Sequence, residues 1–164
     1  MKILNQHQIE QKIRRLAIQI LEQNYDEPEV ILAGINNNGF AFAGLLLQHL
    51  QQLSSIRFTL TRIRLNPAQP VAHPITTELP AEYFSGKVVI IVDDVANTGR
   101  TVFYACQPLM QVLPKKVEVA VLVDRKHKFF PMYADYVGIS LNTTLMEDID
   151  VQIREVEEWA VYLQ

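Results

Sequence analysis

The chain has 164 residues, of which 49% are hydrophobic and 20% are charged, and its formal net charge at pH 7 is −3. These values are typical of a soluble globular protein with one full core, and the net negative charge does not indicate nucleic-acid binding. No apolar run approaches the ~18 residues of a membrane span, and residues 1–10 are too polar for a secretory signal. With a single cysteine, Cys106, the sequence excludes an internal disulfide and predicts a cytoplasmic protein.

Helix and strand patterns alternate along the chain. The first helix is predicted over residues 7–24, with Asn5 as its N-cap, and a second over residues 39–53. Runs of branched apolar residues predict five strands, at residues 30–35, 57–63, 88–92, 117–123 and 136–139. Four prolines between residues 66 and 80 exclude regular structure there. Residues 102–113 are compatible with a helix, and residues 151–163 fit either a strand pair or a short helix.

This alternation predicts an α/β fold, with a central parallel sheet and helices on both of its faces. We expect a single domain over residues 1–164, because the sequence contains no repeats or low-complexity segments. Ligands of such sheets bind at the carboxyl ends of the strands.

The strand predicted at residues 88–92 ends in two adjacent carboxylates, Asp93 and Asp94. A short polar loop then leads into the next helix, and it consists of Ala96, Asn97, Thr98, Gly99, Arg100 and Thr101. Backbone N–H groups and threonine hydroxyls suit a phosphate, and the carboxylates suit sugar hydroxyls or a hydrated Mg²⁺. A generic strand-to-helix turn explains one acid and one glycine, but not the acid pair together with both threonines.

This stretch resembles the ribose-phosphate signature of the type I phosphoribosyltransferases, in which two acids and three further residues precede Thr-Gly-Lys/Arg-Thr. Residues 119–138 and parts of both chain ends are similar to the subgroup of pyrimidine operon attenuators and uracil phosphoribosyltransferases. The resemblance implies a parallel sheet of about five strands plus a small hood. It also implies transfer of a phosphoribosyl group from 5-phosphoribosyl-1-pyrophosphate (PRPP) to a nucleobase, with uracil expected and Mg²⁺ as cofactor. A homo-oligomer, such as a dimer, is the expected assembly.

The resemblance also implies roles for individual residues. Asp93, Asp94 and Arg62 are expected in catalysis, and the two acids at the metal, through ribose hydroxyls or water. Residues 96–101 are expected to bind the phosphate of PRPP. The pyrophosphate loop corresponds to Asn36, Asn37, Asn38 and Gly39, although the family commonly has Lys or Arg just before the second glycine. An ordinary polar turn explains this asparagine loop equally well.

Arg125, Tyr136 and Val137 are the expected base-binding residues, Tyr136 by stacking on the base and Val137 through its backbone. A core aromatic explains Tyr136 equally well, and the basic run at residues 125–128 also fits a solvated loop. Asn97 stands where purine enzymes usually carry an aspartate. Because an amide cannot act as a general base, this residue favours a pyrimidine substrate.

Two departures from the subgroup suggest alternative functions. The asparagine loop carries no charge, and residues 59–64 lack the tyrosine and the two acids that the subgroup places before its mobile hood loop. The alternatives are a PRPP or nucleotide sensor with weak turnover, and an RNA-binding attenuator of pyrimidine genes. The basic candidates for RNA binding are scattered, which does not favour the attenuator: Lys12, Arg14, Arg15, Lys115 and Lys116.

Overall fold

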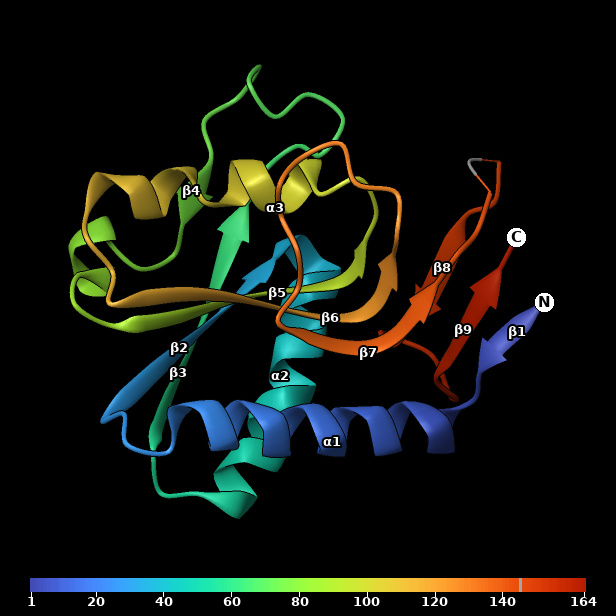
Figure 1. The fold of residues 1–164 in the computed structure, drawn as a ribbon, viewed down its shortest axis with the longest axis horizontal. Helices are drawn as coiled ribbons and strands as arrows, with labels where there is room; N and C mark the ends of the chain where they lie inside the picture. Colours follow the sequence, from blue (N-terminus) through green and yellow to red (C-terminus); the bar gives the residue numbers. More distant parts are fainter. Residues whose placement is uncertain (145) are drawn as a thin grey trace.

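The computed structural model describes residues 1–144 and 146–164. Its centre is a six-stranded sheet in the order β4-β3-β2-β5-β6-β7 (Figure 1). The parallel strands are β2 (Glu29–Ile35), β3 (Arg57–Arg64), β5 (Val88–Ala96), β6 (Lys116–Arg125) and β7 (Tyr136–Leu141). The predicted α/β fold with a parallel sheet of about five strands is therefore confirmed.

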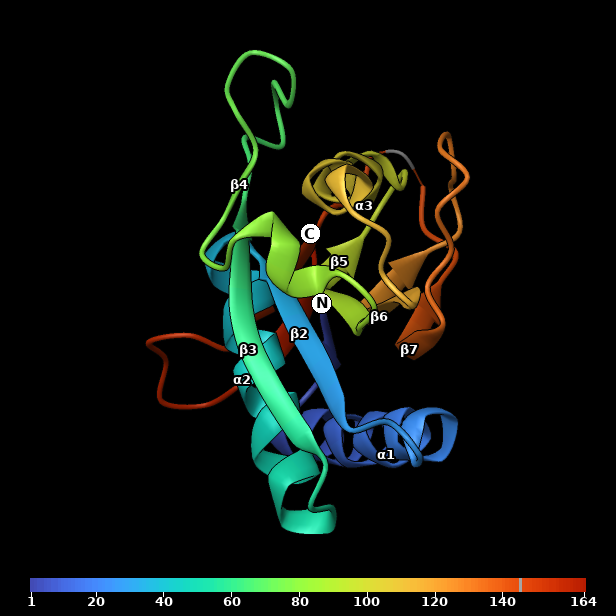
Figure 2. The same ribbon diagram turned by 90° about the vertical axis from the view of Figure 1, so that its left-hand side faces the viewer.

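The sixth strand corrects the prediction for the proline-rich segment. β4 (Thr76–Thr77) pairs antiparallel with the end of β3, within residues 66–80 where no regular structure was expected. The short strand is possible because β4 lies at the edge of the sheet and contains no proline itself. The segment before it forms the long loop that rises above the sheet in Figure 2.

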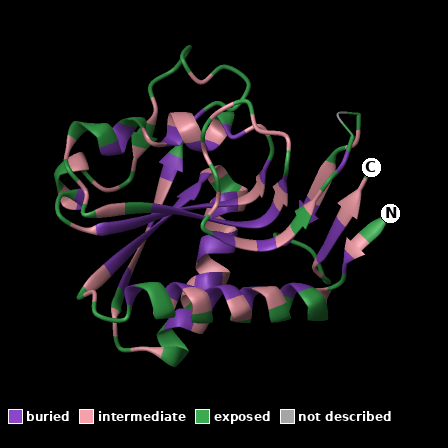
Figure 3. Cartoon of the chain, in the orientation of Figure 1, coloured by how far each residue is buried: buried purple, intermediate pink, exposed green. Residues whose placement is uncertain are grey.

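Helices cover both faces of the sheet, as Figure 2 shows. On one face lie α1 (Gln6–Asn24) and α2 (Asn36–Leu53), and on the other lie α3 (Arg100–Ala105) and the 3₁₀ helices η1 (Ala81–Phe84) and η2 (Gln107–Gln111). Alternate residues of β5 point to opposite faces, so Ile90 packs with α1 and α2 whereas Ile91 packs with α3. Figure 3 shows the resulting buried centre.

Local sequence explains how two of these helices begin and end. Asn5 caps α1 as predicted: its Oδ1 accepts from the Gln8 backbone N–H at 2.9 Å, and Gln8 Oε1 accepts from the Asn5 N–H at 2.9 Å. The helix expected over residues 102–113 is broken instead, and α3 ends at Ala105 before the 3₁₀ helix η2. Pro108 accounts for the break, because it has no N–H to continue the α-helical hydrogen bonds.

A second, smaller sheet joins the two ends of the described chain. β1 (Lys2–Leu4) pairs antiparallel with β9 (Ala160–Leu163), which pairs antiparallel with β8 (Ile149–Gln152). Of the two expectations for residues 151–163, the strand pair is therefore confirmed. This sheet stands beside β7 in Figure 1, and its buried Leu4, Val151 and Val161 extend the core beneath α1 and α2.

None of the helices in the described part of the chain combines the length and the apolar character that crossing a membrane requires.

Candidate active site

The acid pair and the asparagine loop lie at one edge of the sheet. The acid pair lies in the last part of β5 and the asparagine loop follows β2, and these two strands are parallel neighbours with Val92 opposite Gly34. A cavity of about 440 Å³ opens at this edge, and its lining includes Asn36, Asn37, Asn38, Asp93, Asp94, Thr101 and Arg154. Two segments 57 residues apart in sequence, from residue 36 to residue 93, thus share one cavity.

The two carboxylates differ in their environments. Asp93 is only 9% exposed, and its Oδ1 accepts a hydrogen bond from the Asp94 backbone N–H at 2.9 Å. Burial, and then the neighbouring charge of Asp94, raise the pKa of Asp93 well above its ordinary value. Asp94 is half-buried, and its Oδ2 accepts from Asn38 Nδ2 at 3.2 Å. Such a pair of carboxylates is stabilised by a bound cation or by hydroxyl donors.

Close packing of α2 against β5 holds these groups together. A Cβ atom added to Gly39 would lie 2.5 Å from the Val92 carbonyl oxygen, too close for any side chain. Glycine at this position therefore lets the first turn of α2 approach the acid pair. The helix begins at Asn36, three residues earlier than predicted, so the asparagines occupy its first turn. Their N–H groups belong to the positive end of α2, where no preceding turn supplies acceptors.

Each of the three asparagines bonds to a different part of the protein. Asn36 adopts a left-handed backbone with φ of 51°, and its side chain bonds to the backbone N and O of Leu65 at 3.1 and 3.0 Å. Asn37 Oδ1 accepts from Arg62 Nη1 at 2.7 Å, and Asn38 Oδ1 accepts from Arg154 Nε at 2.8 Å. Asn36 therefore has a structural role, while the other two asparagines contact arginines.

Arg62 lies at the rim of this site rather than inside it. Its guanidinium carbon is 3.9 Å from the centre of the Phe40 ring, and its Nε is 3.4 Å from Glu78 Oε1. Together with the bond to Asn37, these contacts fix the side chain beside the loop. Arg62 is not among the residues that line the acid cavity, so its expected catalytic role remains a prediction.

The loop at residues 96–101 lines a second cavity of about 510 Å³, together with Pro67, Ala68, Phe129 and Phe130. The Thr98 carbonyl accepts from the backbone N–H groups of Phe129 and Phe130, at 3.0 and 3.1 Å. Arg100 Nη2 donates to the Pro67 carbonyl at 2.8 Å. The loop is thus held between two other loops. Its backbone N–H groups and threonine hydroxyls are the donors that it offers to an anion, although the Arg100 N–H also donates to Thr98 Oγ1 at 3.4 Å.

Gly99 is required by the shape of this loop. Its φ is 89°, in the left-handed region, and an added Cβ would meet the Phe130 carbonyl oxygen at 3.2 Å. The α3 helix that follows has only 6 residues. Its dipole is therefore small, so the binding of an anion here would depend on the donors of the loop itself.

Arg125 is buried beside the phosphate loop and is occupied by protein groups. It donates to Thr143 Oγ1 at 2.7 Å, to the Thr144 carbonyl at 2.6 Å and to Asn97 Oδ1 at 3.2 Å. Lys128 Nζ donates to the Asn97 carbonyl at 2.8 Å and to Asp124 Oδ1 at 2.7 Å. Part of the basic run at residues 125–128 therefore positions Asn97, in contrast to the alternative of a solvated loop.

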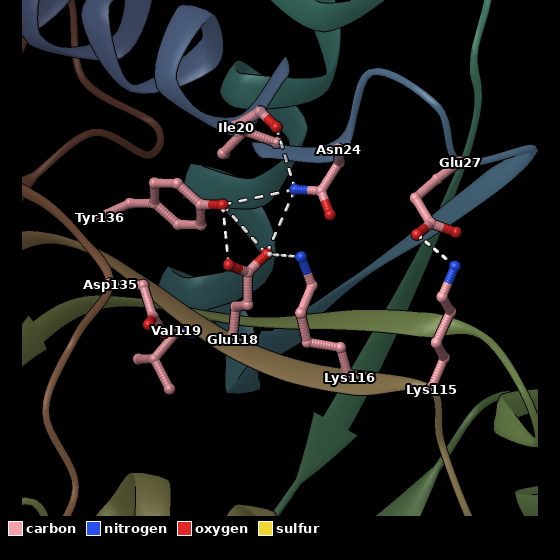
Figure 4. Close-up of polar contacts among 9 residues, drawn as sticks. All are labelled: Ile20, Asn24, Glu27, Lys115, Lys116, Glu118, Val119, Asp135 and Tyr136. Atoms are coloured by element: carbon pink, nitrogen blue, oxygen red, sulfur yellow. Dashed lines mark hydrogen bonds and ion pairs between the residues drawn. The ribbon is translucent and has the colours of Figure 1, made fainter. Parts of the chain in front are cut away.

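The expected base-binding role of Tyr136 and Val137 needs correction. Both lie at the start of β7, where Tyr136 is opposite Ala120 and Val137 is opposite Val121, and neither is among the described residues that line the two cavities. Tyr136 is 3% exposed, and Figure 4 shows its hydroxyl between Glu118 and Asn24. It donates to the Glu118 carboxylate at 2.9 Å, and Asn24 Nδ2 lies 3.3 Å away.

The environment of these residues accounts for the correction. Burial, together with the Glu118 carboxylate, raises the pKa of the Tyr136 hydroxyl. The Val137 carbonyl accepts from Arg15 Nη2 at 3.1 Å. Tyr136 is thus a core residue that bonds to α1, and neither residue reaches the cleft.

Sequence reasoning missed several cleft residues. Phe129 and Phe130 are two adjacent aromatic residues directly after a basic run, and this pattern is a signal that the sequence does contain. In the structure Phe129 is 73% exposed. For Pro67 and Ala68, the proline-rich sequence predicts only the absence of regular structure. Arg154 had no local signal, because only the small sheet brings it to α2.

Comparisons with known proteins agree with this geometry. Residues 1–157 match the family model described as "Phosphoribosyl transferase domain". The chain is 35% identical over 159 residues to the "Bifunctional protein PyrR" of Streptococcus uberis, covering 95% of this chain and 91% of that protein. A protein of the same name from Streptomyces coelicolor is 35% identical over 163 residues, with coverages of 93% and 83%.

Solved structures with the same fold are more distant in sequence. The hypoxanthine phosphoribosyltransferase of Trypanosoma cruzi superposes with a TM-score of 0.78 at 18% identity, covering 98% of this chain and 95% of that chain. A hypoxanthine-guanine phosphoribosyltransferase from Bacillus anthracis gives a TM-score of 0.72 at 21% identity, with coverages of 87% and 84%. At these identities the likeness is one of fold.

Proposed function

The chain belongs to the phosphoribosyl transferase domain family, and from this premise we propose that it transfers the phosphoribosyl group of PRPP to uracil. The products are the nucleoside 5′-monophosphate and pyrophosphate. One observation carries the proposal: the acid cavity and the phosphate-loop cavity adjoin, and Val95, Asn97 and Thr101 line both. This arrangement suits a ribose that has a 5′-phosphate on one side and a pyrophosphate on the other.

In the proposed reaction a base nitrogen forms a bond to C1 of the ribose, and the proton on that nitrogen passes to the departing pyrophosphate. The bond between C1 and the pyrophosphate oxygen breaks, and its electron pair leaves with the pyrophosphate. Loop 96–101 holds the 5′-phosphate, and the Asp93 and Asp94 carboxylates hold the ribose hydroxyls and stabilise the positive charge that develops on the ring. The phosphate loop and residues 67–68 and 129–130 restrict water at this site.

The acid pair also fits the proposed Mg²⁺. Among the described residues, no group of three or more His, Cys, Asp or Glu side chains is arranged to hold a metal ion. Two adjacent carboxylates that leave the remaining positions to water and phosphate oxygens are typical of Mg²⁺ sites. We propose that Asp93 and Asp94 hold the ion through water or the ribose hydroxyls. When bound, it would neutralise charge on the pyrophosphate.

Uracil is proposed from two features of the chain. Asn97 provides a neutral amide where removal of a proton from a purine would need a base, and Arg125 and Lys128 hold this residue in place. The relatives at 35% identity also carry the name "Bifunctional protein PyrR", and the sequence resembles the pyrimidine subgroup.

A turnover assay tests the proposal. Purified protein with PRPP and Mg²⁺ is given uracil, hypoxanthine, guanine, xanthine or orotate in parallel, and pyrophosphate release is measured. We expect uracil to be used fastest, and Asp94→Asn to reduce the rate strongly, because the acid contacts the reacting sugar. A higher rate with any purine would overturn the assignment of the base. Pyrophosphate release at the same rate when no base is added would overturn the transfer reaction.

A second candidate function is a sensor that binds PRPP or a nucleotide with little turnover. The uncharged asparagine loop favours it. In this case the protein would still bind PRPP or a nucleoside monophosphate tightly, while pyrophosphate release would stay near background with every base. Rapid release with uracil would exclude it.

The RNA-binding alternative has weaker support. Three of its five basic candidates are engaged within the protein: Arg15 with the Gly138 carbonyl at 2.6 Å, Lys115 with Glu27 at 2.6 Å and Lys116 with Glu118 at 3.6 Å. Figure 4 shows the two lysines beside their acidic partners. Because RNA affinity depends on phosphate contacts by free cations, we expect no binding at physiological salt. A filter-binding titration with single-stranded RNA measures it.

A further inference from the structure

The acid cavity contains a basic side chain that does not come from the asparagine loop. Among the described residues that line this cavity, Arg154 is the one with a positive charge. It lies in the turn between β8 and β9, more than a hundred residues after the loop that it touches. The inference below concerns this residue and rests on the proposed function.

Arg154 is connected to the acid pair through one amide. Its Nε donates to Asn38 Oδ1 at 2.8 Å, and Asn38 Nδ2 donates to Asp94 Oδ2 at 3.2 Å. The amide is therefore oriented with its oxygen toward the guanidinium and its nitrogen toward the carboxylate. An asparagine suits this position because it can accept and donate at once, whereas a basic side chain can only donate.

The bond to Asn38 uses Nε alone. Among the residues that the structure describes, none forms a hydrogen bond or ion pair with Nη1 or Nη2 of Arg154. These two nitrogens form one planar edge of the guanidinium, and such an edge matches two phosphate oxygens at once. The side chain is exposed, so this edge is accessible to a ligand in the cavity.

In the folded protein, the residue before Arg154 is held in the core and the residue after it begins a turn. Ile153, directly before it, is 7% exposed and packs in the core beneath α1 and α2. Glu155, directly after it, has a φ of 53°, a left-handed conformation that turns the chain back toward β9. Arg154 thus enters the acid cavity directly after a core residue when the small sheet is in place.

We propose that Arg154 binds the pyrophosphate group of PRPP and takes the place of the basic residue that the loop lacks. The asparagine loop then positions the guanidinium through Asn38 and adds the N–H groups of α2, while the arginine provides the charge. This assignment predicts selectivity: Arg154 contributes to ligands that carry pyrophosphate and not to a nucleoside monophosphate, which has only the 5′-phosphate bound at loop 96–101.

Isothermal titration calorimetry with Mg²⁺ present tests the assignment, using PRPP, inorganic pyrophosphate and uridine 5′-monophosphate as ligands. For Arg154→Gln we expect the affinities for PRPP and pyrophosphate to fall by about tenfold or more, because a charge-assisted pair of bonds is lost. The affinity for the monophosphate should change by less than about twofold, since no contact to it is removed. Arg154→Lys should recover part of the loss.

Arg57→Gln is the matched control, because Arg57 is an exposed arginine at the opposite end of the sheet, with its side chain 73% exposed. It removes the same net charge and should leave all three affinities unchanged. If Arg154→Gln binds PRPP as tightly as the wild type, or loses PRPP and monophosphate equally, the assignment is overturned.

These results separate the two proposals. An enzyme that turns over uracil while Arg154→Gln keeps its PRPP affinity refutes the role of Arg154 alone. Wild-type protein that binds neither PRPP nor the monophosphate refutes the proposed function, and the role of Arg154 with it.

Discussion

Three consecutive asparagines show how identical residues differ in role once the chain is folded. Asn36 ties the start of α2 to the end of β3, Asn37 holds Arg62, and Asn38 lies between Arg154 and Asp94. From sequence alone the three are equivalent, and the loop resembles a pyrophosphate site that has lost its charge. The structure shows instead that two of them contact arginines from other elements.

This arrangement predicts that Asn38→Arg changes the affinity for PRPP in the direction opposite to the one that the family suggests. By analogy with the family, an arginine here would restore a charge-assisted contact and tighten PRPP binding. In the structure it would place a second guanidinium against Arg154 and would pair with Asp94 instead. We expect the affinity for PRPP to fall, by roughly tenfold.

Titration calorimetry with PRPP measures the effect, and Asn38→Gln, which keeps the amide, serves as the comparison. Tighter binding of PRPP by Asn38→Arg would mean that Arg154 does not occupy the position that a basic loop residue would take.

Thr98→Val tests whether the hydroxyl of a single loop residue binds the phosphate. The substitution removes a hydroxyl donor and keeps the shape of the side chain, while the Thr98 carbonyl can still accept from Phe129 and Phe130. Loss of a hydrogen bond to a charged phosphate costs about 1.5–3 kcal/mol, so the affinity for uridine 5′-monophosphate should fall roughly tenfold or more. Thr76→Val, an exposed position in β4, is the control. Equal affinities for the wild type and Thr98→Val would remove this hydroxyl from the site.

At the scale of elements, the end of the sheet opposite the cleft carries a polar cluster of its own. Glu29, at the start of β2, accepts from Thr59 of β3 at 2.5 Å and from Tyr83 of η1 at 2.7 Å, and Lys87 Nζ lies 3.5 Å away. Burial would raise the pKa of Glu29, but these hydrogen bonds and the charges of Lys87 and Arg57 outweigh it, and the pKa lies below its ordinary value of 4.5. The cluster ties three elements together and is remote from the proposed chemistry.

The lowered pKa of Glu29 has a definite consequence for stability. A carboxyl whose folded pKa is depressed stabilises the protein above its unfolded pKa, and this contribution is lost as the pH falls through the folded pKa. Glu29→Gln should therefore lower the free energy of unfolding by about 1–3 kcal/mol at pH 7, with the difference from wild type shrinking below about pH 4.

Urea unfolding at several pH values measures this difference, and Glu82→Gln, at an exposed position, is the control. A difference that grew on acidification would contradict the assigned sign. Turnover should stay the same at neutral pH, because the cluster does not touch the cleft.

The elements also show how far sequence reasoning reaches. Buried strands such as β5 are visible as apolar runs, and the acid pair with its phosphate loop is contiguous, so both were predictable. The apolar pattern also predicts the strand that contains Tyr136, but not that its hydroxyl bonds to Glu118 of β6 and lies beside Asn24 of α1, because these contacts depend on how distant elements pack. Arg154 was unpredictable for the same reason, because its position depends on how β8 and β9 pair.

At the scale of the whole molecule, the two sheets should differ in local stability. The core of β5 is fully buried between two helical layers, whereas β1 has only two pairing positions with β9, Lys2 opposite Tyr162 and Leu4 opposite Val161. Few buried contacts allow local opening at low free energy. We expect amide hydrogen exchange to be faster in β8 and β9 than in β5, as measured by mass spectrometry. Equal protection in both sheets would contradict this prediction.

The pairing of β1 with β9 joins the two ends of the described chain and so closes its longest loop, at a cost in chain entropy. We expect the small sheet to open while the large sheet stays folded, and Arg154 would then leave the cleft with it. Pyrophosphate that binds only the closed form would shift this equilibrium by mass action. Saturation with pyrophosphate should accordingly slow amide exchange in β8 and β9 first, which makes the ligand a clamp on the least stable part of the fold.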